Sequence, residues 1–266
     1  MTNLRRFRWL LVVFGFFVPQ WAAAFTFDMS EAEFSIWPMY CQARYSSIEV
    51  GKEHSFSMNY PRNLIEQARE QLGAATFERV HHWCAGMTWL NRARIESDAK
   101  LREFQLTSAK SEALFTLVGL LPDSSIIPSI FVTLGLICQE QKDFNCAIDN
   151  FEKAIATRAT DPSPYSALAL LHRKRKDLNL ARDALLRGDK ALGGKSPEIH
   201  YNLGLILLEM GDVPGALQYA QQAYLEGHPL PGLRKKLAQI GRWVEPTSNT
   251  PELPPAAQSP LPPSAQ

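Results

Sequence analysis

The stretch FVTLGLICQEQKDFNCAIDNFEKA, residues 131–154, is the first of three similar segments between residues 129 and 225. The matching alanines Ala147, Ala181 and Ala216 are 34 and then 35 residues apart. Around each of them, a small residue, a large apolar residue and a second small residue recur. A period near 34 residues indicates stacked helical hairpins, because one hairpin alone cannot bury its apolar face. The sequence therefore predicts an all-α protein built from repeated hairpins.

The residue types within each repeat indicate how a hairpin is built. An aspartate stands just before each second helix (Asp143, Asp177 and Asp212), where a carboxylate can accept the free backbone N–H groups. Small residues such as Gly135 let the two helices of a hairpin approach closely, and large residues such as Phe151 fill the space between hairpins. We expect three such hairpins and a capping helix to occupy residues 128–244.

The segments on either side of the three repeats are less regular. Residues 25–76 predict short helices and loops, with a capping box at Ser30 and Glu33, a restart at Pro38 and a polar loop over residues 46–59. Residues 77–127 predict a divergent hairpin, because the terminal units of a repeat stack are usually atypical. A helix over residues 231–243 combines an apolar stripe with a basic outer face, as a C-terminal cap requires. Residues 245–266 contain seven prolines, so we expect a disordered tail.

The first 24 residues predict a cleaved secretory signal. Three arginines precede an apolar run over residues 9–18, and the alanines at 22–24 supply the small-residue pattern that a signal peptidase recognises. The apolar run is shorter than the ~20 residues that span a bilayer, which leaves an uncleaved anchor as the alternative. Cleavage after Ala24 removes three positive charges and changes the formal net charge from +1 to −2. We therefore expect a periplasmic protein with no stable membrane span, and its charge disfavours nucleic acid as a partner.

The four cysteines predict two disulfides if the chain is exported. An even number of cysteines in an oxidising compartment favours disulfides, and four cysteines allow three connectivities. Cys138 lies near the end of one predicted helix and Cys146 near the start of its antiparallel partner, so they should face each other. Pairing them leaves Cys41 with Cys84. The alternative for Cys138 and Cys146 is two buried free thiols, since cysteine packs as a small apolar residue.

The repeat resembles the tetratricopeptide repeat (TPR) family. The pattern positions of the family match Leu134, Gly135, Ala147, Phe151 and Ala154 in the first unit, and Leu203, Gly204, Ala216 and Ala223 in the third. The departures are Ala169 in place of glycine, Gly188 in place of alanine and Ala220 in place of a large aromatic residue. The block from His81 to Ala85 also looks like the leader unit of some exported TPR proteins of Gram-negative bacteria.

The resemblance implies a right-handed solenoid of helical hairpins whose first helices line a concave groove for a partner protein. By register, the groove residues should be Trp83, Met87, Leu90, Val132, Leu136, Gln139, Ser166, Leu170, Arg173, Lys174, Tyr201, Leu205 and Leu208. Some TPR domains hold a terminal carboxylate with lysine and asparagine at these positions. Here Leu136, Leu170 and Leu205 replace the asparagine, so the floor suits an amphipathic helix or a hydrophobic segment instead.

A group of histidines and cysteines and a run of basic residues indicate alternatives to a scaffold. His54, His81, His82, Cys41 and Cys84 could ligate zinc or copper, which makes a periplasmic metal- or small-ligand-binding protein the alternative. Adjacent histidines on one helix point about 100° apart, so both cannot easily bind one ion. The basic run over residues 172–176 either attracts an anionic partner or is a solvated helix end. No catalytic motif is present, so we expect neither an enzyme nor a cofactor, but a periplasmic adaptor for an envelope process such as secretion, surface-polymer export or appendage assembly.

Overall fold

The computed structural model describes residues 27–246 and is all-helical over that range, with thirteen α-helices and no β-strand. The predicted signal at residues 1–24 and most of the proline-rich tail, residues 247–266, lie outside the described residues. Within residues 27–246, every helix is too short or too polar to traverse a lipid bilayer.

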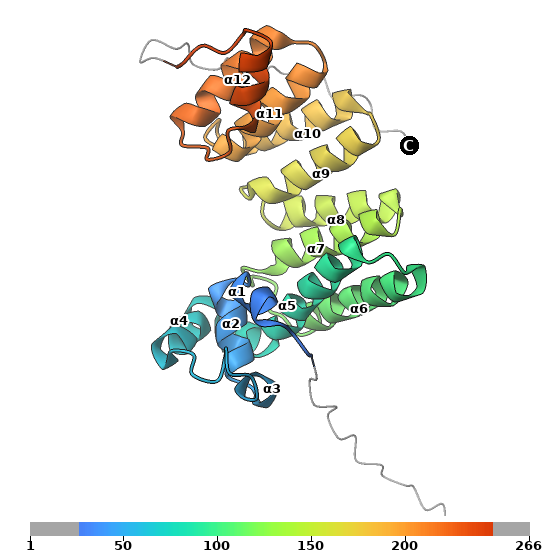
Figure 1. The fold of residues 1–266 in the computed structure, drawn as a ribbon, viewed down its shortest axis with the longest axis vertical. Helices are drawn as coiled ribbons and strands as arrows, with labels where there is room; N and C mark the ends of the chain where they lie inside the picture. The colour runs from blue at the N-terminus through green and yellow to red at the C-terminus, as the bar shows by residue number, and fades with distance from the viewer. Residues whose placement is uncertain (1–26, 247–266) are drawn as a thin grey trace, which may run out of the picture.

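Eight helices form four consecutive hairpins, and these hairpins follow one another along the longest axis of the molecule (Figure 1). The divergent hairpin consists of α5 (Ala74–Ile95) and α6 (Ala99–Leu117). The three repeats consist of α7 (Ile127–Glu140) with α8 (Phe144–Thr157), α9 (Pro162–Lys174) with α10 (Leu178–Ala191), and α11 (Pro197–Glu209) with α12 (Val213–Leu225).

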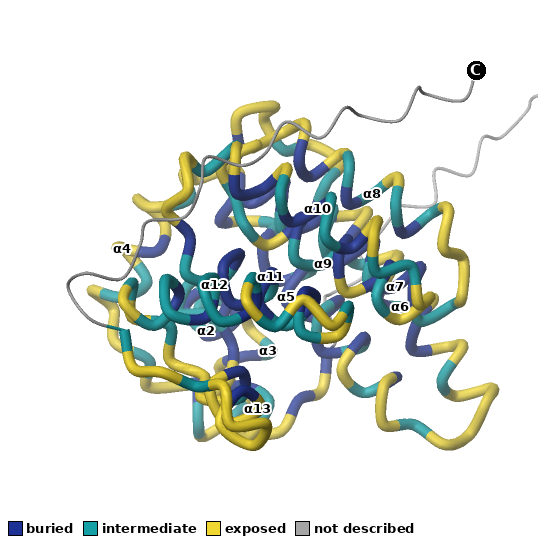
Figure 2. Tube along the Cα trace, turned by 90° about the horizontal axis from the view of Figure 1, so that it is seen from above, coloured by how far each residue is buried: buried dark blue, intermediate teal, exposed yellow. Residues whose placement is uncertain are grey.

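The hairpins are joined through their first helices. Helices α5, α7, α9 and α11 contact one another in succession, and each of α6, α8 and α10 packs both on its own partner and on the first helix of the next hairpin. Each helix therefore turns one side toward its neighbours and another outward, and buried and exposed residues alternate along the chain (Figure 2). Burial between neighbouring hairpins is the main source of stability in such a stack.

The turn between the two helices has the same geometry in all three repeats. The residue before each aspartate has a positive φ: 62° at Lys142, 66° at Lys176 and 84° at Gly211. Asp143 accepts a hydrogen bond from the Cys146 amide at 3.0 Å, and Asp212 accepts one from Gly215 at the same distance. These two aspartates are the helix caps that the sequence predicts, whereas the side chain of Asp177 makes no such bond.

The small residues lie where the helices of a hairpin approach each other. A Cβ atom on Gly135 would overlap the ring of Phe151, which is fully buried. The departure from the repeat pattern at Gly188 has a similar reason, because a Cβ atom there would lie 2.8 Å from Cγ of Tyr165. Glycine at these two positions thus leaves room for an aromatic ring.

The N-terminal region consists of four short helices: α1 (Glu31–Ser35), α2 (Met39–Ser46), α3 (Glu49–Lys52) and α4 (Arg62–Leu72). The predicted capping box is present, since the side chains and amides of Ser30 and Glu33 bond reciprocally. Two expectations are corrected. Helix α3 lies within the segment predicted to be a loop, and α5 begins at Ala74, so the hairpin starts before residue 77.

The C-terminal cap is the short helix α13 (Gly232–Gln239), which packs on α11 and α12. Leu233 and Leu237 are fully buried against these helices. The cap ends before Trp243, earlier than predicted, because Gly241 takes a φ of 66° and the chain turns away. Ile240, which follows the last residue of the helix, is therefore 51% exposed.

Both disulfides have the predicted pairing. Cys41 of α2 is bonded to Cys84 of α5, with their Cα atoms 5.9 Å apart. Cys138 of α7 is bonded to Cys146 of α8, with a Cα–Cα distance of 5.7 Å. Both distances lie within the range of ordinary disulfides. One bond therefore ties the N-terminal region to the stack, and the other closes the first repeat.

Candidate functional site

The first-helix side of the second and third repeats carries the most accessible group of the predicted groove residues. Ser166, Leu170 and Arg173 recur at helical spacing on α9, and together with Asn202 and Leu205 of α11 they line a shallow hollow between the two helices. We call these five residues the α9–α11 face. Leu170 is its most accessible apolar side chain, at 42% exposure.

Polar contacts between α9 and α11 hold this face in place. Asn202 Nδ2 donates a hydrogen bond of 3.1 Å to Ser166 Oγ. At the other end, Arg173 forms a two-point ion pair with Glu209, in which Nε lies 2.8 Å from Oε2. The hydrogen bond to Glu209 raises the pKa of Arg173. The apolar centre of the face is thus bordered by a neutral polar pair on one side and a charged pair on the other.

The predicted groove residues of α7 contribute less surface. Val132 and Leu136 are partly buried and pack on the core between the first two repeats. Gln139 is only 8% exposed, so it offers almost no surface to a partner. Lys174, at the end of α9, is exposed as expected. The usable part of the predicted groove is therefore centred on α9 rather than spread evenly over the stack.

The three predicted residues of α5 do not form an open groove floor. Trp83 and Leu90 are each only 3% exposed. The N-terminal region covers Trp83, whose ring stacks on Tyr40 at 6.3 Å. Leu90 instead packs between α5, α6 and α7. Met87 is partly buried and lines a small pocket closed by Trp37 of the N-terminal region.

The cap covers part of the predicted groove at the opposite end of the stack. Tyr201 is 9% exposed and stacks on His228, with ring centroids 4.0 Å apart. Leu205 and Leu208 are partly buried against the cluster that contains Leu233 of the cap. Tyr201 is therefore corrected from a groove residue to a core residue, and Leu205 marks the boundary of the accessible face.

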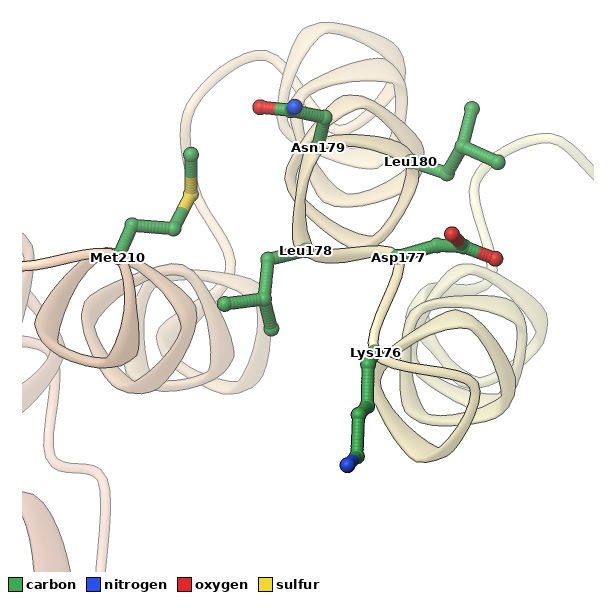
Figure 3. Close-up of a pocket in the computed structure, with 6 residues that line it drawn as sticks. All are labelled: Lys176, Asp177, Leu178, Asn179, Leu180 and Met210. Carbon is green, nitrogen blue, oxygen red and sulfur yellow. The ribbon is translucent and has the colours of Figure 1, made fainter.

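A second depression lies at the turn between α9 and α10. It is lined by residues 176–180 and by Met210 at the end of α11. Leu178 and Met210 point into the space between the hairpins, whereas Leu180 points to the opposite side of α10 (Figure 3). The depression is open and its charged residues alternate in sign, so it does not concentrate one kind of charge.

The basic run over residues 172–176 is divided among several surroundings. His172 is 8% exposed, and burial followed by the nearby Arg175 lowers its pKa. Arg173 is paired with Glu209, and Arg175 lies over the ring of Phe144. These positions favour the interpretation of a solvated helix end over a single anion-binding patch.

Three of the candidate metal ligands, Cys41, Cys84 and His82, have other partners in the structure. Cys41 and Cys84 are bonded to each other and offer no free thiolate. Burial, then His82 and Arg44, lowers the pKa of His81 to about 2. His82 Nδ1 lies 2.6 Å from Glu112 Oε2. Within residues 27–246 no group of three or more His, Cys, Asp or Glu side chains is arranged to hold a metal ion.

A buried polar network joins the last two repeats. His200 is fully buried, with Nε2 2.9 Å from Oδ1 of Asp189 and Nδ1 2.7 Å from Oε2 of Glu226. Burial alone would lower the pKa of His200, but its hydrogen bonds and charge interactions with these two carboxylates raise it. An imidazole that donates to two carboxylates carries a proton on both nitrogens. No motif in the sequence indicates this network, because its members come from three different helices.

The chain matches no model of a known protein family, and no curated protein is similar enough to count as a relative.

Proposed function

We propose that this protein is an exported helical-repeat scaffold of the TPR type, and that it binds a partner protein through the α9–α11 face. The proposal for the repeat type rests on three observations: the spacing of 34 and 35 residues, the succession of contacts between first helices, and the repeated positive-φ turn. A right-handed solenoid with a concave first-helix side is the arrangement proposed to unite these features.

The observation that carries the functional proposal is the composition of the α9–α11 face. It places an exposed leucine between a hydrogen-bonded polar pair and a two-point ion pair, and all of these groups are held on regular helices. An apolar centre with a polar border is the usual arrangement of a protein-binding surface. The proposed partner is an amphipathic helix or extended segment that places an apolar side chain against Leu170 and Leu205.

The proposed location is the periplasm. Two disulfides support an oxidising compartment, and they agree with the secretory signal expected from residues 1–24. The proposed role is to hold components of an envelope process, such as secretion, surface-polymer export or appendage assembly, next to one another. In this role the protein performs no chemistry itself, and affinity comes from apolar burial on the face.

Capture experiments with point variants test this proposal. Tagged wild-type protein, Leu170→Glu and Leu205→Glu would be used to recover proteins from a periplasmic extract, with quantification by mass spectrometry. Leu180→Glu is the matched control, because Leu180 is 47% exposed but lies outside the face. We expect the amount of partner recovered to fall at least about tenfold with Leu170→Glu, since binding would bury an uncompensated carboxylate. With Leu180→Glu, the amount recovered should be unchanged. Equal recovery by all variants would contradict the proposed face.

A further inference from the structure

The outer side of α6 differs from the other second helices. Six of the large apolar residues that are more than 40% exposed lie on α6 or just after it: Leu101, Phe104, Leu114, Phe115, Val118 and Leu121. In contrast, α8 and α10 expose charged residues, among them Asp149, Lys153, Arg187 and Lys190. Helix α6 packs on α5 and α7, where Phe104 contacts Trp89 and Phe115 contacts His82, and the rest of this apolar side is exposed. An exposed apolar patch of this kind indicates a contact surface.

The spacing of the residues on this side follows a heptad pattern. Leu101, Phe104, Ser108, Ser111, Phe115 and Val118 are separated alternately by three and four residues, and we call these six residues the α6 strip. A 3–4 alternation places residues along one line of a helix and is typical of a helix that pairs with another helix. None of the six residues is charged.

The residue types along the strip follow the same order in both directions: an aliphatic residue, a phenylalanine and a serine. Counted from the two ends, Leu101 matches Val118, Phe104 matches Phe115, and Ser108 matches Ser111. If two copies of α6 lie antiparallel, these become the pairs that face each other. Small serines then lie at the centre, where the helix axes are closest, and phenylalanines pack against each other on both sides.

Charged groups border the strip but do not belong to it. Glu112 borders the strip, but its carboxylate already binds His82 Nδ1 at 2.6 Å. Lys100 borders the strip on one side, about 50° from its centre, and the Arg79 guanidinium lies 5.4 Å from the ring centroid of Phe115, whereas Glu103 and Lys110 lie about 110° to 130° away at 100° per residue. The six residues of the strip itself carry no charge, so an equally uncharged surface complements it. That surface is present on the chain itself.

We propose that two copies of this protein associate through the α6 strip, as an antiparallel helix pair with its two-fold axis between Ser108 and Ser111. Such an interface is isologous, since each copy contributes the same residues. This inference is independent of the α9–α11 face, because the two surfaces share no residue.

The area of the strip indicates how strongly two copies should associate. A helix of 19 residues is about 29 Å long, and a contact about 10 Å wide covers roughly 300 Å² of each copy. The total of about 600 Å² is below the roughly 1,200–2,000 Å² of stable interfaces, so we expect a weak, transient dimer that forms only at high protein concentration.

Sedimentation velocity over a range of concentrations tests the association. Wild-type protein should change from monomer to dimer between about 5 and 500 µM, and Phe104→Glu should weaken the dimer at least about tenfold. Leu180→Glu is again the control with a similarly exposed apolar residue outside the strip. A single monomeric species at all concentrations, or a dimer that Phe104→Glu leaves intact, would overturn the proposal.

Cross-linking tests the antiparallel register without disrupting the fold. All four native cysteines are in disulfides, so an added cysteine supplies the only free thiol among the described residues. A mixture of Ser108→Cys and Ser111→Cys proteins, with tags of different size, should form a mixed disulfide dimer on mild oxidation. Asn145→Cys, which is exposed on α8, is the control. Mixed dimer no more abundant than the Asn145→Cys dimer would refute the register and therefore the proposal.

Discussion

Replacing His200 by leucine tests whether the buried network fastens the last two repeats together. The wild-type imidazolium compensates two carboxylates, from Asp189 in α10 and from Glu226 at the end of α12. The Asp189 side chain is only 5% exposed, so without His200 it is left as a buried charge with little access to water. Removing one member of a buried ion pair costs about 3–5 kcal/mol, and we expect His200→Leu to lower the free energy of unfolding by that amount.

The same network predicts a pH dependence of a definite sign. The pKa of His200 is raised in the folded protein above its ordinary value of 6.5. Its contribution to stability is therefore fully present below pH 6.5 and is lost as the pH rises through the folded-state pKa. Tyr219 adds nothing to this slope near neutrality, because burial, followed by Asp189, raises its pKa to about 12.

Urea unfolding followed by circular dichroism, at several values between pH 6 and pH 9, measures both effects. His172→Leu is the matched control: His172 is also a buried helix histidine, but burial, followed by Arg175, lowers its pKa, and its Nδ1 has no hydrogen-bond partner among the described residues. We expect His172→Leu to leave the free energy of unfolding nearly unchanged above pH 6.5. The reasoning would be refuted if His200→Leu cost less than about 1 kcal/mol, or if the wild-type protein and this variant lost stability equally with rising pH.

Three further substitutions test the packing of the repeats. Gly135→Ala should destabilise the protein by about 1–2 kcal/mol in urea unfolding, since crowding against Phe151 exceeds the gain of about 1 kcal/mol in helix propensity; a stabilised variant would contradict the close approach. Replacing Cys138 and Cys146 together by alanine should cost about 2.5 kcal/mol, the loop entropy for a sequence separation of 8, measured as a lower urea midpoint. Gly211→Ala should cost about 1 kcal/mol by thermal unfolding, because φ there is 84°; an unchanged melting temperature would show that the turn relaxes.

Much of the local structure could be predicted because it is encoded within short segments. Asp143 and Asp212 cap helices through bonds to residues three positions along the chain, and Ser30 and Glu33 bond over the same distance. The pairing of Cys138 with Cys146 depends only on the turn between α7 and α8, because the two cysteines lie on either side of it. Repetition of the pattern at 34 and 35 residues then identifies equivalent positions in each hairpin, since a repeated local sequence forms a repeated local structure.

The accessible surface was predicted less well, because it depends on segments that are distant in sequence. The same helical register that leaves Leu170 exposed predicted exposure for Trp83 and Tyr201. Tyr40 of the N-terminal region covers Trp83. His228, in the segment between α12 and the cap helix α13, covers Tyr201. Repeat register gives the direction in which a side chain points, but only the tertiary structure decides what lies in front of it.

Periodicity and contacts along one or two turns were thus enough to predict most of the helices, their pairing into hairpins and the Cys138–Cys146 bond. The tertiary structure alone decided which faces stay open and which polar groups meet. Asp189, His200 and Glu226 come together because three helices pack around one point, and the α6 strip stays exposed because none of the helices within residues 27–246 packs over it. Both outcomes depend on how whole elements are placed in space, which periodicity along the chain does not specify.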